Sequence, residues 1–207
     1  FTNTGEIQLN SSYDMNGSWK LKYEKALSKM FILDLITGGA SNQSLTNSKN
    51  KIYISPGDKF VRVGGKAKIL SQDNGNIFTS SIRGSVGRVL AEEKHGYFFS
   101  EIINSYDFSE KITFNLNPKM SFSGSGESVG LGTSLHWNLL KGVTLIPETN
   151  IAIDDAESNI TFAIRFSPID SYRHIDIYTS NAYSLIDIGQ LMKRDEIILG
   201  INLGMIF

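Results

Sequence analysis

Apolar and polar residues alternate with a period of two through most of the chain. Because side chains on a β-strand point alternately to opposite faces, this alternation predicts strands with one apolar and one polar face. Segments 29–36 and 96–106 hold apolar residues on both parities, and a slip of one residue there would exchange their faces. The predicted strands cover residues 5–13, 18–26, 29–36, 59–70, 76–90, 96–106, 110–122, 128–140, 143–153, 159–166, 172–178 and 196–207.

The length of these segments favours a membrane barrel over a soluble sandwich. Strands of soluble proteins usually have about 5–6 residues, whereas crossing a bilayer at a tilt takes about 9–11. The polar face is rich in Gly, Ser, Thr and Asn, which suits a wet lumen. We therefore predict an all-β fold, a transmembrane antiparallel up-and-down β-barrel of about 12 strands (about 10–14), formed by residues 1–207 as a single domain. The rival fold, a soluble sandwich, would stay in solution without detergent.

The connections between these strands differ in length in a regular way. The two long ones, residues 37–58 and 179–195, both fall in the odd-numbered set, and the even-numbered set is short, down to Lys141–Gly142. Outer-membrane barrels have short periplasmic turns and longer external loops. An even strand number then puts both termini on the periplasmic side. Aromatic residues fall near both rims, where a membrane interface favours them: Trp19 at the outer rim, and Trp137, Phe166 and Phe207 at the inner rim.

The chain ends in "IILGINLGMIF", an apolar stripe that runs from Ile197 to Phe207. This segment resembles the C-terminal strand of Gram-negative outer-membrane β-barrel proteins, in which alternating apolar positions end on Phe. The resemblance implies that the barrel assembly machinery recognises this strand, and that the strand pairs with the first one to close the barrel. The alternative is an ordinary core strand at a chain end.

Composition excludes several classes of function. The chain has 20 Lys and Arg against 21 Asp and Glu, so no net charge points to nucleic acid, and the lack of Cys excludes disulfides and thiolate sites. The longest apolar run, Met30 to Ile36, contains Asp34 and is far shorter than the about 20 residues of a membrane-spanning helix. The chain begins at Phe1 without an initiator Met. Either a signal peptide has been removed, or the sequence is the C-terminal part of a longer protein.

Basic residues predominate among the charges predicted to face the lumen. Besides Lys20 and Lys22, we expect Arg62, Lys66, Lys68, Arg83, Lys111 and Arg165 to set selectivity, against Glu24, Glu148, Asp176 and Glu196, with Asp154 at a rim. A cationic lining inside low-dielectric walls favours anions. Alternatively, the charges pair across neighbouring strands and fill a narrow interior.

Two polar groupings are candidate sites. Ser134, His136 and Asn138 share one strand face, and they are the basis for the alternative of an outer-membrane lipid or glycan hydrolase. His174 and Asp176 share a face beside Arg165, a network more typical of an ion pair that fills a barrel. No His has companions at a metal-ligand spacing, so we expect no metal and no cofactor.

Residues Ala182 to Arg194, "AYSLIDIGQLMKR", place Leu185, Ile188 and Leu191 at helical spacing. A short helix there would cap the barrel mouth, fold inward as a constriction, or pack on its own rim. The expected function is an outer-membrane channel that passes small hydrophilic solutes, leaning toward anions, with outer-membrane lipid, the assembly machinery and the solute as partners. Nucleic acid is not expected, and an oligomer is compatible with the pattern. The alternatives are the hydrolase and a barrel component of an envelope export or assembly machine.

Overall fold

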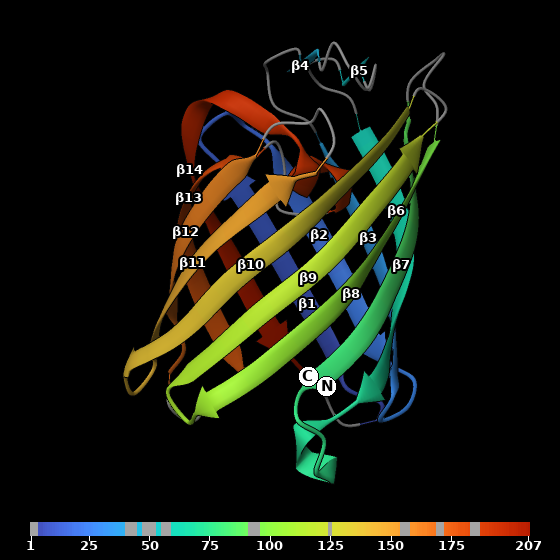
Figure 1. Ribbon diagram of the computed structural model, residues 1–207. Helices are drawn as coiled ribbons and strands as arrows, with labels where there is room; N and C mark the ends of the chain where they lie inside the picture. The colour runs from blue at the N-terminus through green and yellow to red at the C-terminus, as the bar shows by residue number, and fades with distance from the viewer. Residues whose placement is uncertain are drawn as a thin grey trace.

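The chain forms a closed antiparallel β-barrel of twelve strands (Figure 1). The computed structural model describes residues 4–39, 45–46, 53–54, 59–90, 96–123, 126–153, 158–168, 172–182 and 187–207. The barrel strands are β1 (Ile7–Asp14), β2 (Trp19–Ala26), β3 (Phe31–Gly39), β6 (Lys59–Leu70), β7 (Thr79–Val89), β8 (Gly96–Ser109), β9 (Ile112–Ser123), β10 (Gly126–Leu140), β11 (Val143–Ala152), β12 (Asn159–Phe166), β13 (Arg173–Ala182) and β14 (Lys193–Ile206).

The first and last strands close the barrel, as the resemblance of the C-terminal segment implies. β1 pairs antiparallel with β14, in a register that matches Gln8 with Ile206 and Asp14 with Gly200. Ile7 and Phe207 exchange backbone hydrogen bonds beyond the end of this ladder. Closure leaves no free edge among the twelve barrel strands, and it excludes the sandwich.

Apolar residues cover the outside of the barrel, and polar residues fill its inside. On β14, Leu199, Ile201 and Leu203 are each 46–48% exposed. Among the buried residues, in contrast, are Asp34, Arg62 and Glu101. This arrangement is the reverse of a soluble core, and it is the one that suits strands surrounded by lipid.

The two strands of uncertain parity, β3 and β8, each keep a charged residue inside. In β3, Leu33 and Leu35 are exposed on the outer face while Asp34 is buried. In β8, Phe98 and Ile102 are exposed outside while Glu101 is buried. Their inner faces also carry apolar residues, Ile36 and Phe99, which is why alternation alone did not decide their faces.

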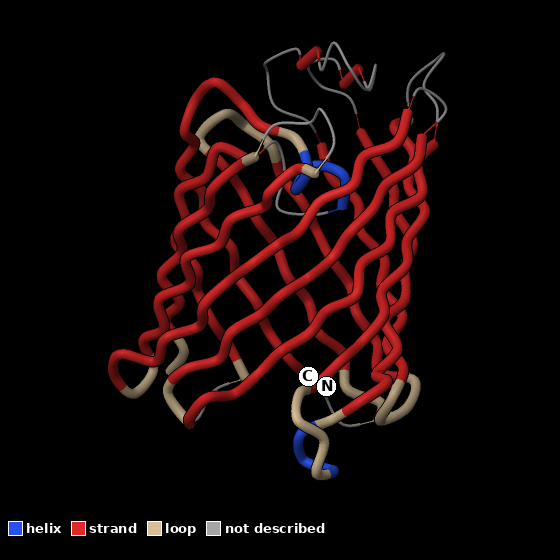
Figure 2. The backbone as a smooth tube through the Cα atoms, viewed as in Figure 1, coloured by secondary structure: helices blue, strands red, loops and turns tan. Residues whose placement is uncertain are grey.

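The two ends of the barrel differ, as the connection lengths predict (Figure 2). At one end, here called the turn end, lie the short connections 27–30, 71–78, 110–111 and 141–142, the strand ends where β12 is followed by β13, and Phe207. The strand ends at the other end, the loop end, are those where β1 is followed by β2, β3 by β6, β7 by β8, β9 by β10, β11 by β12 and β13 by β14. The tight connection at Lys141 is possible because Gly142 adopts a φ of 83°.

Besides the barrel strands, the described residues include two short strands and two 3₁₀ turns. A two-residue pair, β4 (Leu45–Thr46) and β5 (Tyr53–Ile54), lies at the loop end, and the 3₁₀ turn η1 (Gln72–Asn74) lies at the turn end. A second 3₁₀ turn, η2 (Asp187–Leu191), follows β13. No helix among the described residues is long and apolar enough to cross a membrane.

Candidate functional site

The turn η2 lies inside the mouth of the barrel at the loop end (Figures 1 and 2). It contacts β8, β9, β10, β11 and β13, and Asp187 and Leu191 are each only 1% exposed. Of the three placements that the sequence left open, the structure therefore shows the inward one. The element is a 3₁₀ turn, and Leu185, the first residue of the predicted helical spacing, lies outside the described residues.

The carboxylate of Asp187 accepts five hydrogen bonds from the barrel wall. Arg62 on β6 donates through Nε to Oδ2 (2.8 Å) and through Nη2 to Oδ1 (3.1 Å). Arg83 on β7 donates through Nη2 to Oδ1 (2.8 Å). Ser85 Oγ (3.1 Å) and the Tyr97 hydroxyl (3.0 Å) both donate to Oδ2. We call these four wall residues the Asp187 site; together they satisfy the acceptor capacity of a carboxylate.

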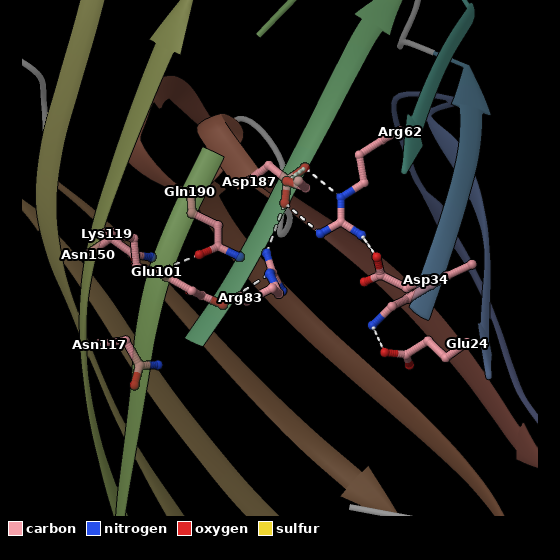
Figure 3. Close-up of polar contacts among 12 residues, drawn as sticks. Glu24, Asp34, Arg62, Arg83, Glu101, Asn117, Lys119, Asn150, Asp187 and Gln190 are labelled. Carbon is pink, nitrogen blue, oxygen red and sulfur yellow. Dashed lines mark hydrogen bonds and ion pairs between the residues drawn. The ribbon is translucent and has the colours of Figure 1, made fainter. Parts of the chain in front are cut away.

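Both arginines of the Asp187 site also bind acids on the wall (Figure 3). Arg62 Nη1 lies 2.6 Å from Asp34 Oδ1, and Arg83 Nε lies 3.3 Å from Glu101 Oε1. The Arg83 guanidinium also stands over the Phe99 ring, 5.4 Å from its centroid. These contacts fix the arginines on the wall independently of η2.

The rest of η2 is held by polar contacts and by packing. Lys119 Nζ donates to Gln190 Oε1 (2.5 Å) and to Asn150 Oδ1 (2.6 Å). Asn159 Nδ2 donates to the Gln190 carbonyl (2.7 Å). Leu191 packs over Gly130, where a Cβ would overlap the Leu191 side chain. Gly130 thus provides the space into which η2 fits.

The backbone and the ionisation of Asp187 both depend on this setting. Among the described residues, Asp187 is the one non-glycine residue with positive φ, 48°, a conformation that Asp and Asn adopt more readily than most residues. Burial alone would raise the pKa of the Asp187 carboxyl, but Arg83 and Arg62 lower it more, with a hydrogen bond from Tyr97 adding to their effect. The net pKa lies below its ordinary value, so Asp187 is charged at neutral pH.

A polar cavity of about 380 Å³ lies in the lumen, mainly along β1, β2 and β10 to β14. Arg165 reaches Asp176 with two bonds, Nε to Oδ1 (2.7 Å) and Nη2 to Oδ2 (2.9 Å), and Asn202 donates to the same carboxylate (3.0 Å). The charged residues that line the cavity carry both signs: Lys20, Lys22, Glu24, Glu148, Arg165 and Asp176.

Five of the six residues predicted to set selectivity lie on lumen-facing strand positions. Arg62, Arg83 and Arg165 are in ion pairs, and Lys66 and Lys68 follow Arg62 on the inner face of β6, where Lys66 is in register with Arg83. Lys111 was wrongly placed: it lies exposed in the tight turn between β8 and β9, because β9 begins only at Ile112.

The sequence analysis missed the acids that neutralise much of the basic lining. Asp34 and Glu101 lie on the two strands of uncertain parity, and Asp187 comes from a loop. Asp34 and Glu101 are each the one charged residue in an otherwise largely apolar stretch. That signal could have placed both residues in the lumen. Glu196 is exposed, and Asp154 lies outside the described residues.

The candidate hydrolase residues do not form a triad. Ser134 Oγ accepts a hydrogen bond from Asn115 Nδ2 (3.0 Å), and Asn138 bonds to Thr144 (2.7 Å) and to the Glu110 carbonyl (3.1 Å). His136 lines the cavity near Arg165 and Asp176 instead. Within the described ranges, no group of three His, Cys, Asp or Glu residues could hold a metal ion.

The predicted rim aromatics are exposed on the outer face, near the two ends of the barrel. Trp19 begins β2 at the loop end, whereas Trp137, Phe166 and Phe207 lie toward the turn end.

Comparisons with known proteins agree on the fold. No protein-family model matches the chain, and no curated protein is significantly similar to it in sequence. Among solved structures, the chain is similar to the KdgM porin, with a TM-score of 0.66 and 9% identity over 97% of this chain and 98% of that one. It is similar to an outer membrane channel from Pseudomonas putida, with a TM-score of 0.62 and 11% identity over 100% and 97% of the two chains. It is also similar to LpxR from Salmonella typhimurium, with a TM-score of 0.51 and 9% identity over 98% and 99%. The fold is that of a transmembrane β-barrel.

Proposed function

We propose that this protein is an outer-membrane channel for small hydrophilic solutes, and that η2 closes or narrows its mouth. The observation that carries the proposal is a polar lumen with a cavity, together with a short turn inside one end of the barrel that Asp187 fixes to the wall. Two of the similar structures, the KdgM porin and the Pseudomonas putida channel, are named as a porin and as a channel, which supports this function.

We propose an anion preference for the open state in particular. With η2 in place, the Asp187 carboxylate offsets the charges of Arg62 and Arg83. When η2 leaves, that negative charge leaves with it, and Lys66 lies directly beside Arg83 in the same wall. A local excess of positive charge inside a low-dielectric barrel attracts anions.

The membrane setting is part of the proposal. We place the apolar outer face in the outer membrane in contact with lipid, with Trp19 at the outer rim and Trp137, Phe166 and Phe207 at the periplasmic rim, because aromatic side chains favour the membrane interface. The turn end, and with it both termini, would then face the periplasm. We further propose that the assembly machinery recognises Ile197–Phe207, the strand segment that completes the closed barrel. No cofactor is needed for passive passage.

Planar-bilayer recording of refolded protein tests this function. Wild type should show steps between closed and open levels, and a salt gradient should give a reversal potential on the anion side. Lys66→Glu and Lys68→Glu should move that potential toward cations, whereas Lys111→Glu, a charge reversal at an exposed turn residue, should leave it unchanged. Wild type and Asp187→Asn that both insert without conducting would reject the channel and favour the export-machine alternative.

A further inference from the structure

We propose that the Asp187 site is a binding site for the carboxylate of a passing solute, and that such a solute displaces η2 by competing with Asp187. This inference rests on the proposed channel function. The Asp187 side chain is the ligand that occupies the site when η2 is seated. The competing ligand is a small anion that bears a carboxylate.

The donors of the site belong to the wall and not to η2. Arg62, Arg83, Ser85 and Tyr97 come from three adjacent strands, β6, β7 and β8, whose backbone ladders do not involve η2. Asp34 and Glu101 hold the two arginines from the wall side. The site therefore keeps its shape when η2 is withdrawn, and a preorganised site binds its ligand with less loss of entropy.

The chemistry of the donors selects a carboxylate. Arg62 presents a planar fork that already grips both oxygens of a carboxylate, at 2.8 and 3.1 Å. Arg83, Ser85 and Tyr97 supply the remaining hydrogen bonds to the same two oxygens. Bidentate guanidinium pairing favours a carboxylate, whose two oxygens each accept from one arm, over a spherical anion such as chloride, which offers a single acceptor atom.

The resident ligand is suited to displacement. It belongs to a turn of five residues and adopts a left-handed conformation that is less favourable for Asp than the ordinary helical one. The lumen cavity reaches the wall beside the site, since Ile36 lines that cavity and is paired in register with Arg62. A solute in the lumen can therefore approach the site without crossing the wall.

Thiol reactivity measures this displacement without any need for conduction. The chain contains no Cys, so Met192→Cys places a single thiol directly after η2, at a position that is 4% exposed. The probe is N-ethylmaleimide, applied to the refolded full chain in detergent, in sodium acetate or in sodium chloride of equal ionic strength. Lys141→Cys, in an exposed turn at the other end, is the control for intrinsic reactivity.

Acetate at ten times its half-saturating concentration should raise the Met192→Cys modification rate about tenfold over chloride, and should leave Lys141→Cys unchanged. Adding Asp187→Asn should make Met192→Cys react fast in both salts, whereas adding Asp176→Asn should preserve the acetate response. Equal Met192→Cys rates in acetate and chloride would overturn the proposal. An acetate response in a protein that never conducts would support the carboxylate site and reject the channel function. A protein that conducts but shows no acetate response would support the channel function and reject the carboxylate site.

Discussion

Replacing Asp187 with Asn is the most direct test of what holds η2 in the barrel. Asn has nearly the shape of Asp and shares its tolerance of a left-handed backbone, so the φ of 48° at this position stays accessible. The amide keeps one acceptor oxygen, but it turns an NH₂ group toward guanidinium donors that cannot accept. The variant therefore removes the charge and most of the five hydrogen bonds without changing the size of the side chain.

The size of the effect follows from the partners that remain. Breaking a buried, hydrogen-bonded ion pair costs about 3–5 kcal/mol, mainly because the surviving charge is left without a partner. Here Arg62 keeps Asp34 and Arg83 keeps Glu101, so the lower value, about 3 kcal/mol, applies. At about 1.4 kcal/mol per factor of ten, the ratio of displaced to seated η2 should rise about a hundredfold.

Open probability in a planar bilayer is the measurement, with Asp176→Asn as the matched control. Asp176 is also a lumen carboxylate gripped twice by an arginine, but its partners Arg165 and Asn202 are all on barrel strands. We expect Asp187→Asn to open about a hundredfold more often, and Asp176→Asn to resemble wild type. The reasoning is refuted if both variants match wild type, or if both open to the same extent.

Three further predictions concern the same closure. Gly130→Ala should raise open probability, because the added Cβ would overlap the Leu191 side chain. Gly84→Ala is the control and should leave open probability unchanged, because its Cβ would meet nothing within 4 Å. Equal open probabilities for the two variants would contradict the role of Gly130. Tyr97→Phe removes one hydrogen bond to a charged group, worth about 1.5–3 kcal/mol. Open probability should therefore rise at least about tenfold, but less than in Asp187→Asn. An unchanged open probability would show that the Tyr97 hydroxyl does not hold η2. The pKa of Asp187 is lowered when η2 is seated, so the stability that its charge gives the seated state is complete above the ordinary carboxyl pKa and is lost as pH falls through the lowered value. Open probability should therefore rise only below about pH 4. This rise should be absent from Asp187→Asn.

The barrel wall could be predicted from the sequence because its signal is local. Alternation identifies a strand and both its faces from neighbouring residues, and it correctly placed Arg62, Arg83 and Arg165 in the lumen. It is weakest where the lumen itself holds apolar side chains. Ile36 and Phe99 face inward on β3 and β8, and they obscured the parity that Asp34 and Glu101 would otherwise reveal.

The site inside the barrel could not be predicted in the same way, because it joins residues that no local pattern connects. Asp187 and Arg62 are 125 positions apart, and they meet only because the closed register brings β6, β7 and β8 to face the connection after β13. Helical spacing in residues 182–194 correctly suggested an element there. It could not say whether that element would lie above the rim or inside it, because that depends on the space left by Gly130 on β10.

The contacts of the wall with η2 suit a closure that reverses. A buried charge that loses its only partner is expensive, so a plug held by otherwise unpaired wall charges would be permanent. Here the wall groups that bind η2 through charge or amide contacts also bind one another. Arg62 keeps Asp34, Arg83 keeps Glu101, Lys119 keeps Asn150, and Asn159 keeps Asn150 when η2 leaves. The carboxylate of Asp187, for its part, moves from the site into water. Both arrangements therefore leave these charges with partners, which is what the proposed displacement of η2 by a competing carboxylate requires.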